Sequence, residues 1–400
     1  MTHQPTLLEL TEYEPHVLPR DRFTQDLARS LWQSHGAQVS IEEPSFKNEN
    51  RWVLTSQGWV GYIPLSPELH LALRPKVPLD NLFRMLEYAY KVGVFLKDDI
   101  VHVESLEDLY ESLALVLAQR VLERARRGLY RTYIPLEEHT PYVRGRVDLR
   151  HASQAPWDPR IRCHFQEHTA DIEENQILAW TLYAVPRTPL LTDRARPQVL
   201  QAYRQVRPFV ALEPVDPSQC LRRLYHRLNE DYEPMHALCH FFLENVGPSY
   251  RSGERNMVPF LIGMAHLYEE FVARWLEHRG IDGYHLRAQH TMSWDRENGR
   301  QSRMDLVLAD ADTGEPVCVL DTKYKAPDKP SDEDIYQVVF YAHLLGCHEA
   351  ALVYPVPLVS PINTWIGDIH VRTLTFALEG NLDEAGERFL AELGPSLAQL

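Results

Sequence analysis

Two aspartates and a lysine in the C-terminal third of the sequence have a spacing that suits catalysis. In the stretch VCVLDTKYKAPD, residues 317–328, an apolar segment leads directly into Asp321 and Lys323. Seven of the 41 basic residues are lysines, and none lies between Lys97 and Lys323. An amine at this place indicates a role that a guanidinium cannot fill, because burial shifts the pKa of lysine but not that of arginine.

A β-hairpin would bring a second carboxylate to the same place. The segment RMDLVLADADTGEPVCVLDTK has two apolar stretches around the turn-rich ADADTGEP. Asp305 and Asp321 each lie eight residues from Thr313, so a hairpin centred on Thr313 sets them opposite each other, with Cβ atoms about 4.5–5.5 Å apart. Alternation along the second strand puts Val319, Asp321 and Lys323 on one face, and Thr322 on the other.

Carboxylates this close repel each other unless a cation or a proton lies between them. Oxygen ligands of this kind suit Mg²⁺, with Mn²⁺ as a substitute. Such a metal polarises a phosphodiester and lowers the pKa of a bound water, and a neighbouring lysine can orient that water or stabilise negative charge. A single Asp-x-Lys is more often a solvated hairpin end with an ordinary ion pair, so the interpretation depends on the residues around it.

Two further segments carry polar residues that could join the cluster. In the expected helix DIYQVVFYAHLL, Gln337 and Tyr341 stand four residues apart and share one face. Glu269 lies on the expected helix LYEEFVARWL, as a third metal-facing carboxylate or as a surface residue beside Glu270. Candidate catalytic residues are therefore Asp305, Asp321, Lys323, Gln337, Tyr341 and Glu269, with Asp305, Asp321 and Glu269 as metal ligands.

The elements that would hold these residues predict a multi-domain α/β protein, because 400 residues exceed one ordinary core. Residues 37–78 have the pattern of strands, 105–128 and much of 171–250 that of helices. From about 258 follow a helix, three strands (284–293, 303–309 and 317–323), a helix from 332 and a strand. Because APWDPR interrupts regular structure, we place the main boundary near 158, giving domains 1–158 and 159–400 with a core of about 258–375.

Composition narrows the classes of function. The net charge of −15 disfavours autonomous DNA binding, although arginine-rich stretches at 120–131 and 144–162 could form local basic surfaces. There is no long apolar run, no signal-peptide pattern and no paired cysteine motif, so we expect a cytoplasmic protein without a membrane partner. There is also no phosphate-binding loop, so any nucleotide dependence must come from a partner. His236 and His240 have helical metal-ligand spacing but lack an adjacent Glu and a third ligand, and we expect a packed or solvated helix there.

The order Asp305, Asp321-x-Lys323, Gln337-x-x-x-Tyr341 resembles the PD-(D/E)XK nuclease superfamily. Together with VRGRVDL, DIEENQIL and PLDNLFRMLEYAY, it makes the chain resemble the McrC family, the nuclease subunits of McrBC modification-dependent restriction systems. The pattern departs from many nucleases in having DTK in place of ExK and Met304 before the first aspartate.

The resemblance implies a C-terminal PD-(D/E)XK endonuclease domain that uses Mg²⁺. Asp305 and Asp321 would be metal ligands, Lys323 the catalytic lysine, and Gln337 and Tyr341 accessory residues near the DNA backbone. It also implies a McrB-like AAA+ GTPase hexamer as partner, docked by the β-rich N-terminal domain, and DNA carrying a modification of the methylcytosine type. A non-cutting activator of an AAA+ ring and a stand-alone RecB-like nuclease are the alternatives.

Overall fold

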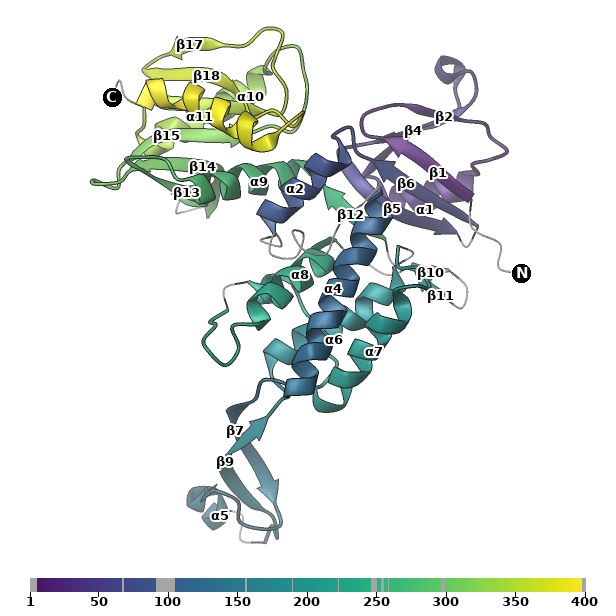
Figure 1. The fold of residues 1–400 in the computed structure, drawn as a ribbon, viewed down its shortest axis with the longest axis vertical. Helices are drawn as coiled ribbons and strands as arrows, with labels where there is room; N and C mark the ends of the chain where they lie inside the picture. The colour runs from purple at the N-terminus through teal and green to yellow at the C-terminus, as the bar shows by residue number, and fades with distance from the viewer. Residues whose placement is uncertain are drawn as a thin grey trace. The chain divides into compact units, whose positions relative to one another are not determined.

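The chain folds into two compact α/β units, which confirms the predicted multi-domain α/β class (Figure 1). The computed structural model describes residues 6–397 except 67, 91–104, 155–156, 189, 222, 246–249, 253–254, 258 and 296–298. The first unit comprises Met1–Leu106, Arg251–Arg255 and Pro259–Leu400, and the second comprises Glu107–Tyr250 and Asn256–Val258. Among the helices within the described ranges, none is long and apolar enough to cross a bilayer.

The division into units differs from the one expected near residue 158. That residue lies in the second unit, between α5 (Leu149–Gln154) and β9 (Ile161–Thr169). Strand β9 pairs with both β7 (Thr132–Thr140) and β8 (Arg146–Val147), so a boundary at 158 would separate strands of one sheet. The expected boundary rests on the sequence APWDPR alone, whereas long-range strand pairing decides which residues belong to one unit.

A six-stranded sheet dominates the C-terminal part of the first unit. Its strands, in spatial order, are β13 (Tyr284–Asp295), β14 (Arg300–Asp310), β15 (Pro316–Thr322), β16 (Glu349–Tyr354), β18 (Ile369–Thr375) and β17 (Asn363–Ile366). The first three are antiparallel, and β15, β16 and β18 are parallel. All residues of β16 are buried, as expected for a central parallel strand covered on both faces. The predicted order of helix, three strands, helix and strand is confirmed.

Helices cover both faces of this sheet. Helix α10 (Asp332–Leu345) packs on one face, where its Val338 and Ala342 join Val319 in an apolar cluster. Helix α11 (Leu382–Leu397) packs on the other face, where the guanidinium of Arg372 on β18 donates to its backbone carbonyls. Helix α10 begins at Ser331, whose hydroxyl accepts from the N–H of Asp334 at 3.2 Å.

Two small sheets form the N-terminal part of the first unit, which is β-rich as expected. One has the order β1-β6-β5-β12, the other β2-β4-β3. Their strands are β1 (Thr6–Thr11), β2 (His16–Leu18), β3 (Val39–Glu42), β4 (Trp52–Ser56), β5 (Trp59–Ser66), β6 (Leu69–Arg74) and β12 (Phe260–Gly263). A helix that we did not predict, α1 (Gln25–His35), and α2 (Leu79–Ala89) complete this part.

Strand β12 joins the N-terminal sheet to the C-terminal part of the same unit. It pairs with β5 and continues directly into α9 (Met264–Arg279). Gly61 permits this pairing, because a Cβ at that position would lie 2.0 Å from the carbonyl oxygen of Phe260. Residues far apart in sequence therefore share one sheet.

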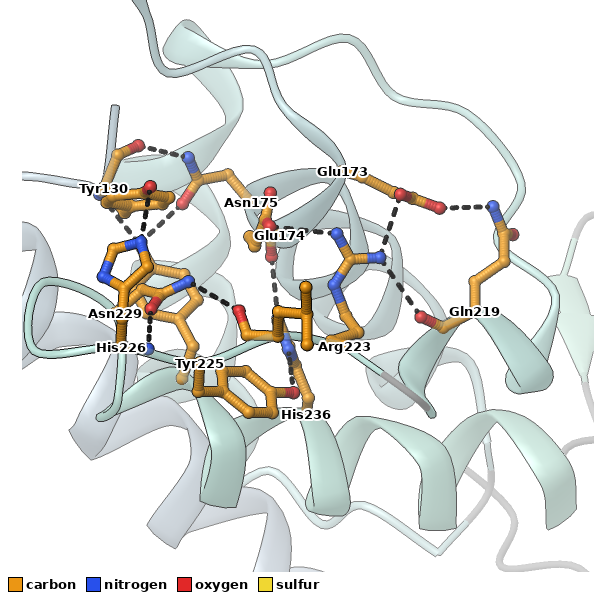
Figure 2. A network of polar contacts seen from close by, with 12 residues as sticks. Tyr130, Glu173, Glu174, Asn175, Gln219, Arg223, Tyr225, His226, Asn229 and His236 are labelled. Atoms are coloured by element: carbon orange, nitrogen blue, oxygen red, sulfur yellow. Dashed lines mark hydrogen bonds and ion pairs between the residues drawn. The ribbon is translucent and has the colours of Figure 1, made fainter. Parts of the chain in front are cut away.

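A partly buried polar network connects residues of the second unit (Figure 2). The longer helices of this unit are α4 (Leu106–Arg127), α6 (Glu173–Ala184), α7 (Arg196–Val206) and α8 (Tyr232–Asn245). Arg223 lies 2.9 Å from Glu173 and 3.0 Å from Glu174, the two glutamates of DIEENQIL. On α8, His236 Nδ1 shares a 2.9 Å hydrogen bond with the hydroxyl of Tyr225, and Nε2 lies 3.0 Å from the carbonyl oxygen of Glu174. Both ring nitrogens are engaged, which confirms a packed histidine and leaves none for a metal.

This network should make folding sensitive to acid. Burial lowers the pKa of His236 to about 4, below the value near 6.5 of an unfolded histidine. The unfolded chain therefore binds this proton first, and stability is lost as the pH falls from about 6.5 to 4. Between pH 6.5 and 4, the free energy of unfolding of His236→Gln should fall by about 2–3 kcal/mol less than that of wild type. Thermal unfolding at each pH measures this difference. The exposed His285 supplies the control, because His285→Gln should follow wild type; equal pH slopes for all three proteins would contradict the assignment.

Candidate active site

The β14–β15 hairpin sets the two predicted carboxylates opposite each other. Leu306 pairs with Leu320 and Val307 with Val319, and one further step in this register brings Asp305 to Asp321. The alignment predicted around Thr313 is therefore confirmed at this end of the hairpin. Nearer the turn the register shifts by one residue, so the irregularity is absorbed away from the aspartates.

Lys323 is held between the hairpin and helix α10. Its ammonium nitrogen lies 2.7 Å from Asp321 Oδ2 and donates to Gln337 Oε1 at 2.9 Å. The amide nitrogen of Gln337 donates in turn to the hydroxyl of Tyr341 at 2.8 Å. The structure thus brings Asp321, Lys323, Gln337 and Tyr341 into one chain of polar contacts. Gln337 acts here as the partner that directs the lysine.

Asp305 is held by the residue between the other two members of the motif. Its Oδ2 accepts from the backbone N–H of Thr322 at 2.7 Å and from the Thr322 hydroxyl at 2.8 Å. Sequence analysis placed Thr322 on the opposite face of the strand and gave it no role. The strand ends at Thr322, and there the hydroxyl reaches across the hairpin to Asp305. The threonine between Asp321 and Lys323 was the feature of the sequence that could have predicted this contact.

Burial and like charge shape the electrostatics of the pair. Burial, followed by the nearby charge of Asp305, raises the pKa of Asp321 to about 7. Burial, followed by the charge of Glu269, also raises the pKa of Asp305. Burial alone would lower the pKa of Lys323, but Asp321 and the other acidic neighbours outweigh it and raise that pKa above 10.5. Lys323 is therefore an ammonium ion at neutral pH. The pKa of Lys323 is raised, whereas burial alone would have lowered it.

Glu269 on α9 reaches the edge of this cluster. Its carboxylate lies 3.5 Å from Arg303 and 3.8 Å from His266. Burial opposes ionisation, but these two basic neighbours hold the pKa of Glu269 below its usual value. The charge of this glutamate acts on Asp305, while Arg303 and His266 favour its ionised form. Its predicted role as a third metal ligand stays a prediction.

The donor set fits a hard divalent cation. Asp321 Oδ2 is buried and receives no well-directed hydrogen bond, although Lys323 lies at ion-pair distance. Within the part of the chain that the structure describes, no three His, Cys, Asp or Glu side chains are grouped to hold a metal. Two carboxylates are nevertheless enough for Mg²⁺, which keeps several waters and binds substrate phosphate oxygens. Asp305 and Asp321 are the residues that would hold it.

An exposed aromatic patch adjoins the cluster and was missed in the sequence. It consists of Trp294 on β13 and of Tyr336 and Phe340 on α10, whose side chains are 40%, 68% and 40% exposed. The Trp294 and Phe340 rings meet edge to face at 5.7 Å, and the Arg300 guanidinium lies 5.7 Å from the Trp294 ring. Tyr336 and Phe340 each precede a member of the polar chain, Gln337 and Tyr341. That adjacency was the signal in the sequence.

Replacing Asp321 should stabilise the protein in the absence of divalent cations. Because the folded pKa of Asp321 lies above that of an unfolded aspartate, stability is lost as the pH rises from about 4 through 7. We expect Asp321→Asn to be more stable than wild type by about 1–3 kcal/mol at pH 8, with a smaller gain at pH 5. Mg²⁺ should raise the melting temperature of wild type but not of the variant. A variant less stable than wild type at pH 8 in a chelator would contradict the assigned repulsion.

The sequence is similar to a known protein family and to a characterised bacterial protein. The sequence matches the family described as "McrBC 5-methylcytosine restriction system component" over residues 54–355. It is 21% identical over 290 residues to the Escherichia coli (strain K12) "Type IV methyl-directed restriction enzyme EcoKMcrBC", covering 67% of this chain and 81% of that protein.

A solved structure supports the same fold. The "Refined half-complex from tetradecameric assembly of Thermococcus gammatolerans McrB AAA+ hexamers with bound McrC" contains a similar chain, with a TM-score of 0.54 and 16% identity. The match covers 98% of this chain and 100% of that one. Since the family match alone spans well over half of the residues, the chain belongs to the family of McrBC restriction system components.

Proposed function

We propose that this chain is the Mg²⁺-dependent DNA endonuclease subunit of a McrBC-like restriction complex. The observation that supports this most strongly is the pair of the half-buried Asp305 and the buried Asp321, with Lys323 held against it. A solvated hairpin end would not bury a carboxylate whose pKa is raised by a second carboxylate. The cluster has the groups that metal-assisted phosphodiester hydrolysis needs.

Each residue then has a distinct task. Asp305 and Asp321 hold the metal, which when bound polarises the phosphodiester and lowers the pKa of a water. Thr322 holds Asp305 in place. Lys323 is protonated, so it stabilises negative charge on the phosphoryl oxygens and does not take up a proton. Gln337 keeps the ammonium directed toward Asp321, and Tyr341 holds the Gln337 amide.

The aromatic patch offers a surface for the DNA strand next to the scissile phosphate. Trp294 lies between Ser293, which pairs with Gln301, and Asp295, which pairs with Arg300, and its indole N–H donates to the hydroxyl of Ser302 at 3.0 Å. Ser302 is three residues from Asp305 on β14, which at about 3.3 Å per residue is roughly 10 Å, or about three nucleotide steps of a DNA duplex. Exposed rings stack on bases of any sequence, and Arg300 adds positive charge beside them.

The arginine-rich stretch 144–162 is less basic than its sequence suggests. Arg162 pairs with Glu137, Arg160 with Asp158, and Arg144 lies 3.8 Å from Glu167. These ion pairs offset much of the positive charge that would attract phosphates. This supports a partner that supplies part of the DNA binding, in keeping with the net charge of −15.

The relatives indicate the class of that partner. The Thermococcus structure joins McrB AAA+ hexamers to bound McrC, and the Escherichia coli relative is methyl-directed. We propose that this chain docks on a McrB-like AAA+ GTPase hexamer and stimulates it, and that the complex acts on DNA with modified cytosine. Docking through the N-terminal region has to be tested with point variants. Deleting residues 1–75 would remove β5 and so the partner strand of β12.

Cleavage by the complete complex tests the proposed nuclease. The chain and its AAA+ partner should cut methylated plasmid with Mg²⁺ and GTP or ATP. We expect Lys323→Ala to lower the cleavage rate by about 100-fold or more, because it removes the charge that stabilises the transition state. Stimulation of the partner's NTPase should stay intact.

Lys329→Ala is the matched control, since Lys329 is an exposed lysine of the same loop. It should cut like wild type. If wild type and Lys323→Ala stimulate the NTPase equally and neither cuts, the chain is a non-cutting activator. Cutting by wild type without any partner would favour a stand-alone nuclease.

The aromatic patch can be tested separately from the chemistry. We expect Phe340→Ala to weaken DNA binding by the complex about tenfold, since stacking contributes about 1–3 kcal/mol per base. The cleavage rate at saturating DNA should change little. His343→Ala removes another exposed side chain of α10 and should leave DNA binding unchanged. Equal affinities of the two variants would remove the patch from the DNA path.

A further inference from the structure

A buried carboxylate from the N-terminal sheet reaches the loop that carries Lys323. Glu12 follows β1 directly and is fully buried. Its Oε2 accepts from the backbone N–H of Lys76 at 3.1 Å and from the hydroxyl of Tyr324 at 3.1 Å. Its Oε1 is buried with no hydrogen-bond partner. Glu12 and Tyr324 are 312 residues apart in sequence and belong to the same compact unit.

This arrangement costs stability. Burial raises the pKa of Glu12, and the hydrogen bonds from Lys76 and Tyr324 offset that rise only in part. A buried oxygen without a donor has lost its hydrogen bonds to water and gained none in exchange, and an apolar side chain of similar size would avoid that cost. The glutamate therefore contributes something other than stability, and among the described residues the side chain that donates a hydrogen bond to it is that of Tyr324.

Tyr324 directly follows Lys323, so the position of Tyr324 constrains the backbone from which the Lys323 side chain extends. The backbone N–H of Lys323 donates to the carbonyl of Val353 at 2.8 Å, and that of Lys325 donates back to the Lys323 carbonyl at 2.9 Å. The Tyr324 ring lies 6.0 Å from the buried Tyr268 ring on α9. The backbone, the ring and the hydroxyl of Tyr324 are thus all held, and the hydroxyl is held by Glu12.

We propose that Glu12 is a positioning residue for Lys323, acting through the hydroxyl of Tyr324. The inference rests on the proposed nuclease function and adds a dependence of that site on the N-terminal sheet. Two strand ends determine the place of Glu12, because its N–H donates to the Arg74 carbonyl at 3.1 Å and its carboxylate accepts from Lys76. A shift of these strand ends would move Glu12, and through its hydrogen bond to the Tyr324 hydroxyl would change the position of Lys323.

The surroundings of those strand ends are charged. Arg74 lies 2.7 Å from Glu9, and Lys76 lies 3.5 Å from Glu14. Both pairs are part-exposed, so they are weak by themselves and sensitive to other charges. Binding events at this end of the sheet would therefore act on Glu12, which gives the nuclease site a physical route for control.

The test compares Glu12→Gln, Tyr324→Phe and the double variant in the complete complex. We expect Tyr324→Phe to lower the cleavage rate about tenfold and Glu12→Gln about three- to tenfold. The double variant should be no slower than the slower single variant, because both changes break one link. The stimulation of the partner's NTPase should stay as in wild type, since it does not depend on where Lys323 points.

Tyr110→Phe is the matched control. It also deletes one buried hydroxyl, bonded to the Val185 carbonyl at 3.3 Å, in a helix of the second unit. It should cut at the wild-type rate. Equal slowing in Tyr110→Phe, wild-type rates in folded Tyr324→Phe, or additive effects in the double variant would each overturn the proposal.

A second readout does not need cleavage. In chains labelled with ¹³C-lysine, the seven lysines give few side-chain signals, and Lys323→Arg identifies that of Lys323. Tyr324→Phe and Glu12→Gln should shift this signal, and Tyr110→Phe should not. If wild type fails to cut, the proposed function fails, but a shifted signal still supports the positioning role; an unshifted signal overturns it.

Discussion

The repulsion between closely spaced carboxylates is the constraint on which the candidate site depends. Asp305 and Asp321 face each other at the end of a sheet, where burial and a neighbouring carboxylate raise the pKa of each; the neighbour is Glu269 for Asp305 and Asp305 for Asp321. A proton, the Lys323 ammonium or a metal ion can offset this repulsion. A site that binds a cation strongly is for the same reason unstable without one.

The rest of the first unit keeps this unfavourable pair in place. The hairpin register aligns the carboxylates, and its irregularity lies toward the turn. Helix α10, capped at Ser331, presents Gln337 to Lys323. These contacts explain why a lysine stands here. Its ammonium lies 2.7 Å from Asp321 and at the same time donates a hydrogen bond to Gln337. A planar guanidinium is larger and would need more space between these two side chains.

Sequence reasoning succeeded where the determining interactions are local. The alignment of Asp305 with Asp321 follows from counting residues about one turn, and the pairing of Gln337 with Tyr341 follows from helical spacing. It failed where the pairing of segments far apart in the sequence determines the structure. The pairing of β12 with β5 puts residues near 260 into the N-terminal sheet, and the pairing of β9 with β7 moves the boundary away from 158. The Thr322 hydroxyl was missed because strand alternation ceases to hold at the strand end.

The same distinction explains why Glu12 escaped notice. An isolated glutamate at the end of a first strand has no pattern in the sequence, and its partner lies 312 residues away. Only the fold shows that it is fully buried and that one of its oxygens lacks a donor. In the proposed nuclease, Lys323 would be correctly placed only when the N-terminal sheet is. Such a dependence would restrain DNA cleavage until the complex is assembled.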